Sequence, residues 1–390
     1  MGDDIISQGR DREPGPWPRR LAVIAALAVV VAAGGGFLTL APRHDAPPLS
    51  HRSIAMSLPP EPEGIAGPTL AWDRDLRLLA AGARPAWFSP ATGRAEPIEG
   101  LPADRSGYQF TRVPGGWAVQ AAPALPAGCG SCAGPPAPVW IISDGARSAT
   151  MLGTASLVAP GATDGTVWLT SYPAGASMAT AAGTAWEAGA TGTPSRPVRL
   201  PPGYAIVQGT ERGLLLAPAS QQPGTADVLW GSFPLKASPV FSGVIAADPD
   251  EIAWTSQCTA SACVRVLNLA TGRRTEVALP AGSSAVNAAF SPDGGFLALE
   301  LSIGSHGDGG ELGMRLEVAP VTSGRLTPVP GTWVSSDALI GFGWPAADDT
   351  LVARFSFTTK MQLASWHPGA RSLAVTIIAP GSNELSLILG

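Results

Sequence analysis

After residue 60, one pattern of apolar and polar positions is repeated seven times. Each copy has an apolar hairpin around a polar or glycine turn, a third strand that usually runs into a Gly or Gly-Arg turn, and an outer strand of period two such as Thr275–Leu279. The third-strand anchors are Trp87, Trp140, Trp186, Trp230, Val266, Val318 and Trp366. They are 36 to 53 residues apart, and a period near 45 with four short strands is typical of a propeller blade. We therefore predict an all-β, seven-bladed β-propeller over 69–390.

The first two strands of each blade are expected as a hairpin. The seven hairpins are Leu70–Ala80, Tyr108–Trp117, Leu157–Leu169, Ala205–Leu216, Val244–Trp254, Phe290–Leu299 and Leu339–Val352. Their turns include Asp248–Asp250 and Ser291–Gly294, where proline presets φ and glycine accepts a positive φ. Closure of the ring requires one further strand, supplied by either Ile54–Leu58 or Leu385–Leu389, because an open sheet edge invites aggregation.

Composition supports a folded body and argues against one class of partner. Charged residues make up only 14% of the chain, against a usual value of about 25%, while 45% of residues are apolar, enough to form a core. The net charge is −5, and the sequence contains no run of Lys and Arg of the kind that binds along a phosphate backbone. Nucleic acid is therefore not expected as a partner. Richness in Ala, Gly and Pro with only two lysines indicates a GC-rich bacterium of actinobacterial type.

The amino-terminal region predicts a membrane anchor. Residues 21–41 are uncharged and apolar apart from Thr39, and as a helix they would span about 31 Å, the thickness of one hydrocarbon core. Four arginines precede this segment, which places residues 1–20 in the cytoplasm and the propeller outside, on the plasma membrane. A cleaved secretory signal with Thr39–Ala41 at its end is the alternative. Residues 42–68 are proline-rich and are expected to form a linker.

Four cysteines fall into two local pairs, Cys129 with Cys132 and Cys258 with Cys263. Outside the cytoplasm disulfides persist, so we expect two bonds, each closing a short loop between two strands of a blade. A redox pair at Cys129 and Cys132, or a zinc site that uses all four cysteines, are the alternatives.

One motif resembles a known family. Phe290–Leu299, which contains Ser-Pro-Asp-Gly, is similar to the hairpin of the Tol-associated and WD-like propeller repeats, and Val266–Gly272 is similar to their third strand and turn. The likeness covers about Leu70 to Pro380 and is good in the fifth and sixth copies. It implies a toroid with a central channel, whose loops bind partners or ligands.

Catalytic motifs are missing from the sequence. It contains no Gly-x-Ser-x-Gly elbow, no His-Glu-x-x-His and no phosphate or dinucleotide loop. Asp164–Trp168 is similar to a sialidase Asp-box but lacks one residue, which favours a tight turn beside a packing Trp. The loops 121–138 and 302–313 are expected on one face of the ring, bordering the channel mouth. We expect the Trp anchors to pack between blades.

These observations favour a binding, scaffolding or sensing module at the cell envelope, without catalytic residues, metal or cofactor. Its partner is expected to be an envelope protein, a small molecule or a glycan, and its ligand-binding residues are unknown. The alternatives are a propeller enzyme, a lyase or glycan-active protein with its site in the axial channel, and a structural envelope component.

Overall fold

The computed structural model describes fifteen parts of the chain. They are residues 65, 72, 74–82, 84–102, 107–122, 132–191, 193–219, 227–231, 236–258, 261–303, 313–335, 338–345, 349–357, 360–378 and 386–389. All of them belong to one compact unit, Ser57–Gly390. The expected cytoplasmic tail, membrane segment and most of the linker lie outside these residues. Within the described part, no helix has the length and apolar character needed to cross a bilayer.

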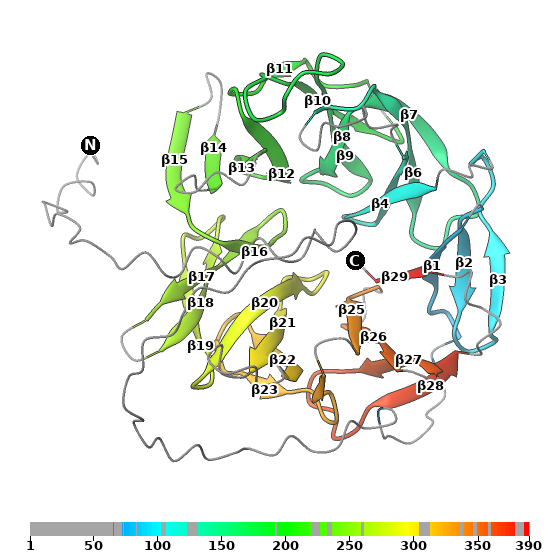
Figure 1. Cartoon of the computed structure of the whole chain (residues 1–390), viewed down its shortest axis with the longest axis vertical. Coiled ribbons are helices and arrows are strands. Elements are labelled where there is room, and N and C mark those ends of the chain that lie inside the picture. The colour runs from blue at the N-terminus through cyan, green and yellow to red at the C-terminus, as the bar shows by residue number, and fades with distance from the viewer. Residues whose placement is uncertain are drawn as a thin grey trace, which may run out of the picture. The chain divides into compact units, whose positions relative to one another are not determined.

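Seven antiparallel sheets lie around a common centre (Figure 1), so the predicted seven-bladed propeller is confirmed. From the inner to the outer strand, blades 1 to 3 contain β29 (Ser386–Ile388), β1 (Leu78–Ala81), β2 (Ala86–Ser89) and β3 (Arg94–Pro97); β4 (Tyr108–Val113), β5 (Gly116–Ala121), β6 (Ala137–Ser143) and β7 (Thr150–Ala155); β8 (Leu157–Pro160), β9 (Thr166–Ser171), β10 (Thr184–Gly189) and β11 (Val198–Arg199).

Blades 4 to 7 follow the same order. They contain β12 (Tyr204–Thr210), β13 (Gly213–Pro218), β14 (Asp227–Gly231) and β15 (Lys236–Phe241); β16 (Val244–Ala247), β17 (Glu251–Gln257), β18 (Ala262–Asn268) and β19 (Arg274–Ala278); β20 (Ser283–Phe290), β21 (Phe296–Ile303), β22 (Gly313–Pro320) and β23 (Thr327–Pro328), with β24 (Val334–Ser335) also on β22; β25 (Leu339–Gly343), β26 (Leu351–Phe357), β27 (Lys360–Trp366) and β28 (Ala374–Ile378).

The repeat was interpreted correctly in its main features. All seven anchors lie in the third strand of their blade, and six of the seven predicted hairpins form the two inner strands. The hairpin predicted at Leu70–Ala80 was wrong, because β1 pairs on its inner side with β29. Of the two segments considered for ring closure, the C-terminal one is used: Leu79 pairs with Ile388, and Ala80 pairs with Leu387. This closure covers the sheet edge that β1 would otherwise expose.

The hydrophobic core is divided among the blade interfaces. Seven buried clusters are present among the described residues, one between each pair of neighbouring blades. Successive side chains of a strand point to opposite faces of the sheet, so each blade contributes residues to two clusters. Leu214 and Leu216 of β13 pack toward blade 3, whereas Leu215 packs toward blade 5. No blade buries both of its faces alone, and this is the physical reason why seven repeats form one body.

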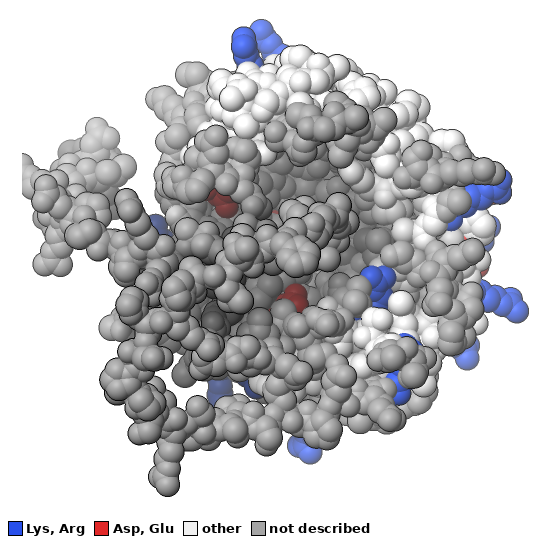
Figure 2. Space-filling view, in the orientation of Figure 1, with Lys and Arg blue, Asp and Glu red and all other residues white. Residues whose placement is uncertain are grey.

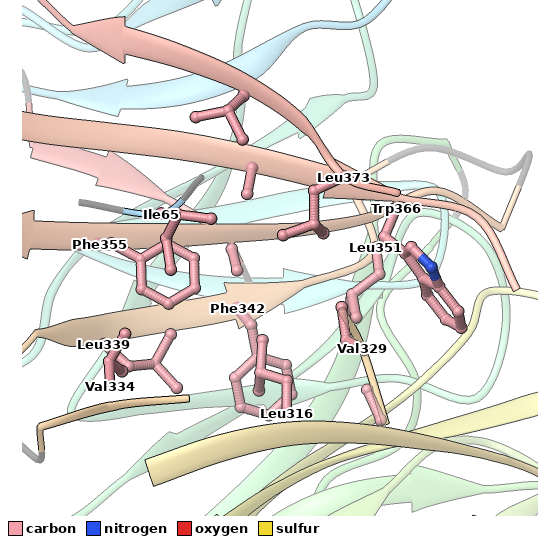
Figure 3. Packing of buried hydrophobic residues seen from close by; sticks show 14 of the residues in the cluster. Ile65, Leu316, Val329, Val334, Leu339, Phe342, Leu351, Phe355, Trp366 and Leu373 are labelled. Atoms are coloured by element: carbon pink, nitrogen blue, oxygen red, sulfur yellow. The ribbon is translucent and has the colours of Figure 1, made fainter. Parts of the chain in front are cut away.

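The cluster between blades 6 and 7 includes one residue from before the propeller (Figure 3). Ile65 is buried there with Phe355 and Leu339. Its backbone N–H donates to Oε1 of Gln362 (2.7 Å), and Nε2 of Gln362 donates to its carbonyl (3.4 Å). Trp72 joins the cluster between blades 7 and 1, and its Nε1 donates to Thr376.

The disulfide prediction is confirmed where the structure describes it. Cys258 and Cys263 are bonded and close the connection between β17 and β18. Cys132 is also disulfide-bonded, while its expected partner, Cys129, lies outside the described residues. The pairing of Cys258 with Cys263 removes two of the ligands that a four-cysteine zinc site would need.

Candidate functional site

The turn between the innermost and the second strand of a blade, called the inner turn here, positions the candidate site. Inner turns of blades 2, 3, 5 and 6, together with the end of β25 in blade 7, line one cavity of about 840 Å³. We call it the channel-mouth cavity, because the inner turns lie at one end of the innermost strands. In antiparallel sheets the turns after the second strands lie at the opposite end. No described residue of the loops 121–138 and 302–313, which were expected at the channel mouth, is part of its lining.

Carboxyl groups dominate the charge of this cavity. Its described lining includes six acidic residues and two arginines: Asp144, Asp164, Asp248, Asp250, Glu251 and Asp293, with Arg112 and Arg273. Arg112 donates to both carboxylate oxygens of Asp144 (2.6 and 2.8 Å) and lies over the ring of Trp117. Arg273 is therefore left to face the remaining acidic groups. On the face shown in Figure 2, most Lys and Arg side chains stand at the rim, and acidic atoms are visible nearer the centre.

Asp248 begins the inner turn of blade 5. Its Oδ1 accepts hydrogen bonds from the backbone N–H of Asp250 (2.8 Å) and of Glu251 (2.6 Å), and its own N–H donates to the carbonyl of Glu251 (2.9 Å). Burial raises the pKa of Asp248 to about 7, against the lowering effect of the two N–H groups, and the neighbouring Glu251 and Asp250 charges add to the rise. Near neutral pH this carboxyl is therefore divided between its acid and its base form.

Glu251 is the first residue of β17 and is only 3% exposed. Nδ2 of Asn268 donates to its Oε1 (3.2 Å), whereas its Oε2 has no hydrogen-bond partner among the described residues. Burial raises the pKa of Glu251; Asn268 and Arg273 act in the opposite direction, and Asp250 and Asp293 add to the rise.

Asp293 lies in the inner turn of blade 6, the neighbour of blade 5 in the ring. Its Oδ1 accepts hydrogen bonds from Oγ of Ser291 (2.6 Å) and from the N–H of Gly295 (2.8 Å). The Ser291 bond, followed by the Gly295 bond, lowers the pKa of Asp293, and a hydrogen bond with Asp349 of blade 7 contributes to the lowering. Asp349 itself has a positive φ of 58°, a conformation that non-glycine residues rarely adopt and that recurs at functional sites.

Sequence reasoning missed these carboxylates as site residues. Asp248 and Asp293 were interpreted as turn formers, which they also are. Their equivalent positions in the repeat could have revealed them, because turns that occupy the same place in each blade lie together at one end of the ring. Asp164, from the Asp-box-like segment, does line the cavity, while Trp168 packs between blades 3 and 4. Three of the Trp anchors pack between blades as expected: Trp87 and Trp366 belong to inter-blade clusters, and Trp186 packs against one. Trp140 is buried as well, and its ring lies edge-on to Tyr108 of its own blade.

No three His, Cys, Asp or Glu side chains among the described residues are grouped so as to hold a metal ion.

Comparisons with known proteins give the fold and no family. No protein-family model matches the chain, and no curated protein matches it significantly. A prolyl endopeptidase structure is 13% identical, with a TM-score of 0.51 over 82% of this chain and 51% of that one. Prolyl oligopeptidase B from Galerina marginata is 10% identical (TM-score 0.49, 79% and 48% covered), and TolB from Acinetobacter baumannii is 11% identical (TM-score 0.39, 76% of each). The chain thus spans about half the length of these prolyl peptidases.

These comparisons change the functional interpretation. A Tol-associated propeller is among the similar structures, as the resemblance in the sequence implied. The main interpretation, a binding, scaffolding or sensing module, is contradicted by the likeness to a prolyl endopeptidase structure (TM-score 0.51).

Proposed function

We propose that this chain is a glycan-cleaving enzyme whose active site is the channel-mouth cavity. Asp248 serves as the general acid and Asp293 as the base. One observation carries the proposal: inner turns of two neighbouring blades bring into one cavity two carboxyl groups whose environments differ in kind. One is partly buried beside other carboxylates, and the other is held by Ser291 and Gly295. A pair of titratable groups whose pKa values are pushed apart supports an assignment of acid and base.

Cleavage of a glycosidic bond needs such a pair. As the bond between the anomeric carbon and the leaving oxygen breaks, Asp248 gives its proton to that oxygen. A water molecule forms the new bond to the anomeric carbon, and its proton passes to the Asp293 carboxylate. Oδ1 of Asp248 already accepts two N–H groups, so the transferable proton belongs on Oδ2.

The environment of each group suits its role. An acid must hold its proton at the working pH, and the burial of Asp248 favours the neutral form. A base must be ionised, and the hydrogen bonds to Asp293 favour its charged form. A prolyl endopeptidase is among the solved structures that share this fold, and the present chain spans 51% of it, so the likeness identifies no substrate.

We also propose that this site works outside the cytoplasm, tethered by residues 21–41. The support is the uncharged apolar segment with arginines on its amino-terminal side, together with the disulfide between Cys258 and Cys263.

The test is cleavage of a panel of neutral, acidic and amino-sugar oligosaccharides by the full-length protein, followed by chromatography of the products. Asp248→Asn and Asp293→Asn are each expected to lower kcat about 100-fold or more while KM changes little. Asp75→Asn, an exposed Asp outside the cavity, serves as the matched control and should keep the wild-type rate. Absence of cleavage across the panel, or an unchanged rate for Asp248→Asn, would refute the proposal.

A further inference from the structure

We propose that the channel-mouth cavity binds the protonated amino group of an amino sugar, with Oε2 of Glu251 as its main acceptor. This inference rests on the proposed glycan-cleaving function and narrows its substrate class.

The geometry of Glu251 provides the first argument. The side chain is almost fully buried yet lines the cavity, and its Oε1 is fixed by Asn268. Its Oε2 has no partner among the described residues and lies against Gly294. The inner turn of the neighbouring blade approaches this oxygen: a Cβ built at Gly294 would stand 3.7 Å from Oε2. A buried carboxylate oxygen without a partner is costly, and a cationic ligand would offset that cost.

The surrounding charges favour a cation. Asp250 and Asp293 are the acidic neighbours of Glu251, and Arg273 is the cationic group that opposes them. Arg112, the second arginine of the lining, is engaged with Asp144. The excess of carboxylates therefore faces the ligand.

The number of free oxygens selects the kind of cation. A guanidinium group binds best to both oxygens of one carboxylate, and Oε1 of Glu251 is already occupied by Asn268. An ammonium group is a compact charge with three donors, so it suits one free oxygen of Glu251 and a second acceptor nearby, such as Asp250. A metal ion fits less well, since the described carboxyl groups include no grouping that could hold one. For a saccharide substrate, the matching group is the amine of an amino sugar.

Ammonium binding should also be linked to protons. A bound cation stabilises the ionised forms of Glu251 and Asp248, so binding releases protons and the affinity rises with pH. The groups that face Glu251 are Asp248, Asp250, Asp293 and Arg273. Among them Asp248, whose pKa is raised to about 7, dominates the change between pH 5.5 and 7.

The experiment compares glucosamine, N-acetylglucosamine and glucose by protein-observed NMR titration of the full-length protein at pH 5.5 and pH 7. None of the three has a glycosidic bond to cleave, so binding is measured apart from turnover. Glucosamine is expected to bind about tenfold or more tightly than the two neutral sugars, as for one charge-assisted hydrogen bond, and more tightly at pH 7 than at pH 5.5. Glu251→Gln keeps the Oε1 acceptor for Asn268 and should remove the preference, whereas Glu96→Gln, an exposed residue of β3, should leave it unchanged.

Each outcome bears on one of the two proposals. Equal affinity for the three sugars, or an undiminished preference in a folded Glu251→Gln variant, overturns the amine site. Cleavage of oligosaccharides without this preference overturns the amine site and leaves the proposed function intact. A preference for glucosamine that depends on Glu251, without any cleavage, supports the amine site and refutes the enzyme.

Discussion

Replacing Asp248 by asparagine should inactivate the protein and, above neutral pH, make it more stable. Oδ1 of an asparagine can accept the same two backbone N–H groups, from Asp250 and Glu251, so the inner turn of blade 5 is retained. The substitution removes a carboxyl group that has to ionise in a partly buried place beside two other acidic side chains.

The magnitude follows from the pKa. Burial raises the pKa of Asp248 from 3.8 to about 7, so the folded protein holds this proton more tightly than the unfolded chain does. The stability that this contributes is fully present below about pH 4 and is lost as the pH rises through 7. At 1.36 kcal/mol per pKa unit, the loss at pH 8 is at most about 4 kcal/mol. Since Asp248 keeps some contact with solvent, we expect about 1–2 kcal/mol between pH 5 and pH 8.

Urea unfolding at pH 5, 6, 7 and 8, followed by tryptophan fluorescence, measures this effect. The free energy of unfolding of Asp248→Asn should exceed that of the wild type by an amount that grows with pH. Asp248→Ala, which also removes the acceptor of the two N–H groups, should be less stable than Asp248→Asn by about 1–3 kcal/mol at every pH. A pH-independent difference between wild type and Asp248→Asn, or a less stable asparagine variant at pH 8, would show that Asp248 is an ordinary ionised turn residue.

Three further predictions concern the fold. Changing Cys258 and Cys263 to serine should lower the free energy of unfolding by about 2 kcal/mol, the value for a loop this short. In this double variant, added reductant should cause no further fall in the melting temperature through the loss of this disulfide. Leu387→Ala in the closing strand β29 should destabilise the ring by about 2–5 kcal/mol in urea unfolding, and a smaller loss would mean that β29 contributes little to closure. Ile65→Ala should cost about 2–5 kcal/mol and Ile65→Val about 0.5–1.5 kcal/mol, and unchanged unfolding of both would show that the segment before β1 does not brace blades 6 and 7.

The candidate site could be predicted only in part. Ser291–Gly294 and Asp248–Asp250 stood out in the sequence as turns between apolar strands, and the structure places both as inner turns. That they line one cavity follows from the ring, which brings together residues more than forty positions apart. The burial of Glu251 and its contact with Gly294 of the next blade left no pattern in the sequence.

The sequence by itself determined the number of blades and the strand order within them, because hairpins and third strands depend on neighbouring residues and on period-two alternation. It also determined the pairing of Cys258 with Cys263, since five positions separate them. Only the tertiary structure decided which segment closes the ring, because Ile54–Leu58 and Leu385–Leu389 are both apolar strand-like segments. It alone set the protonation of Asp248, since burial and neighbouring charge arise when blades meet.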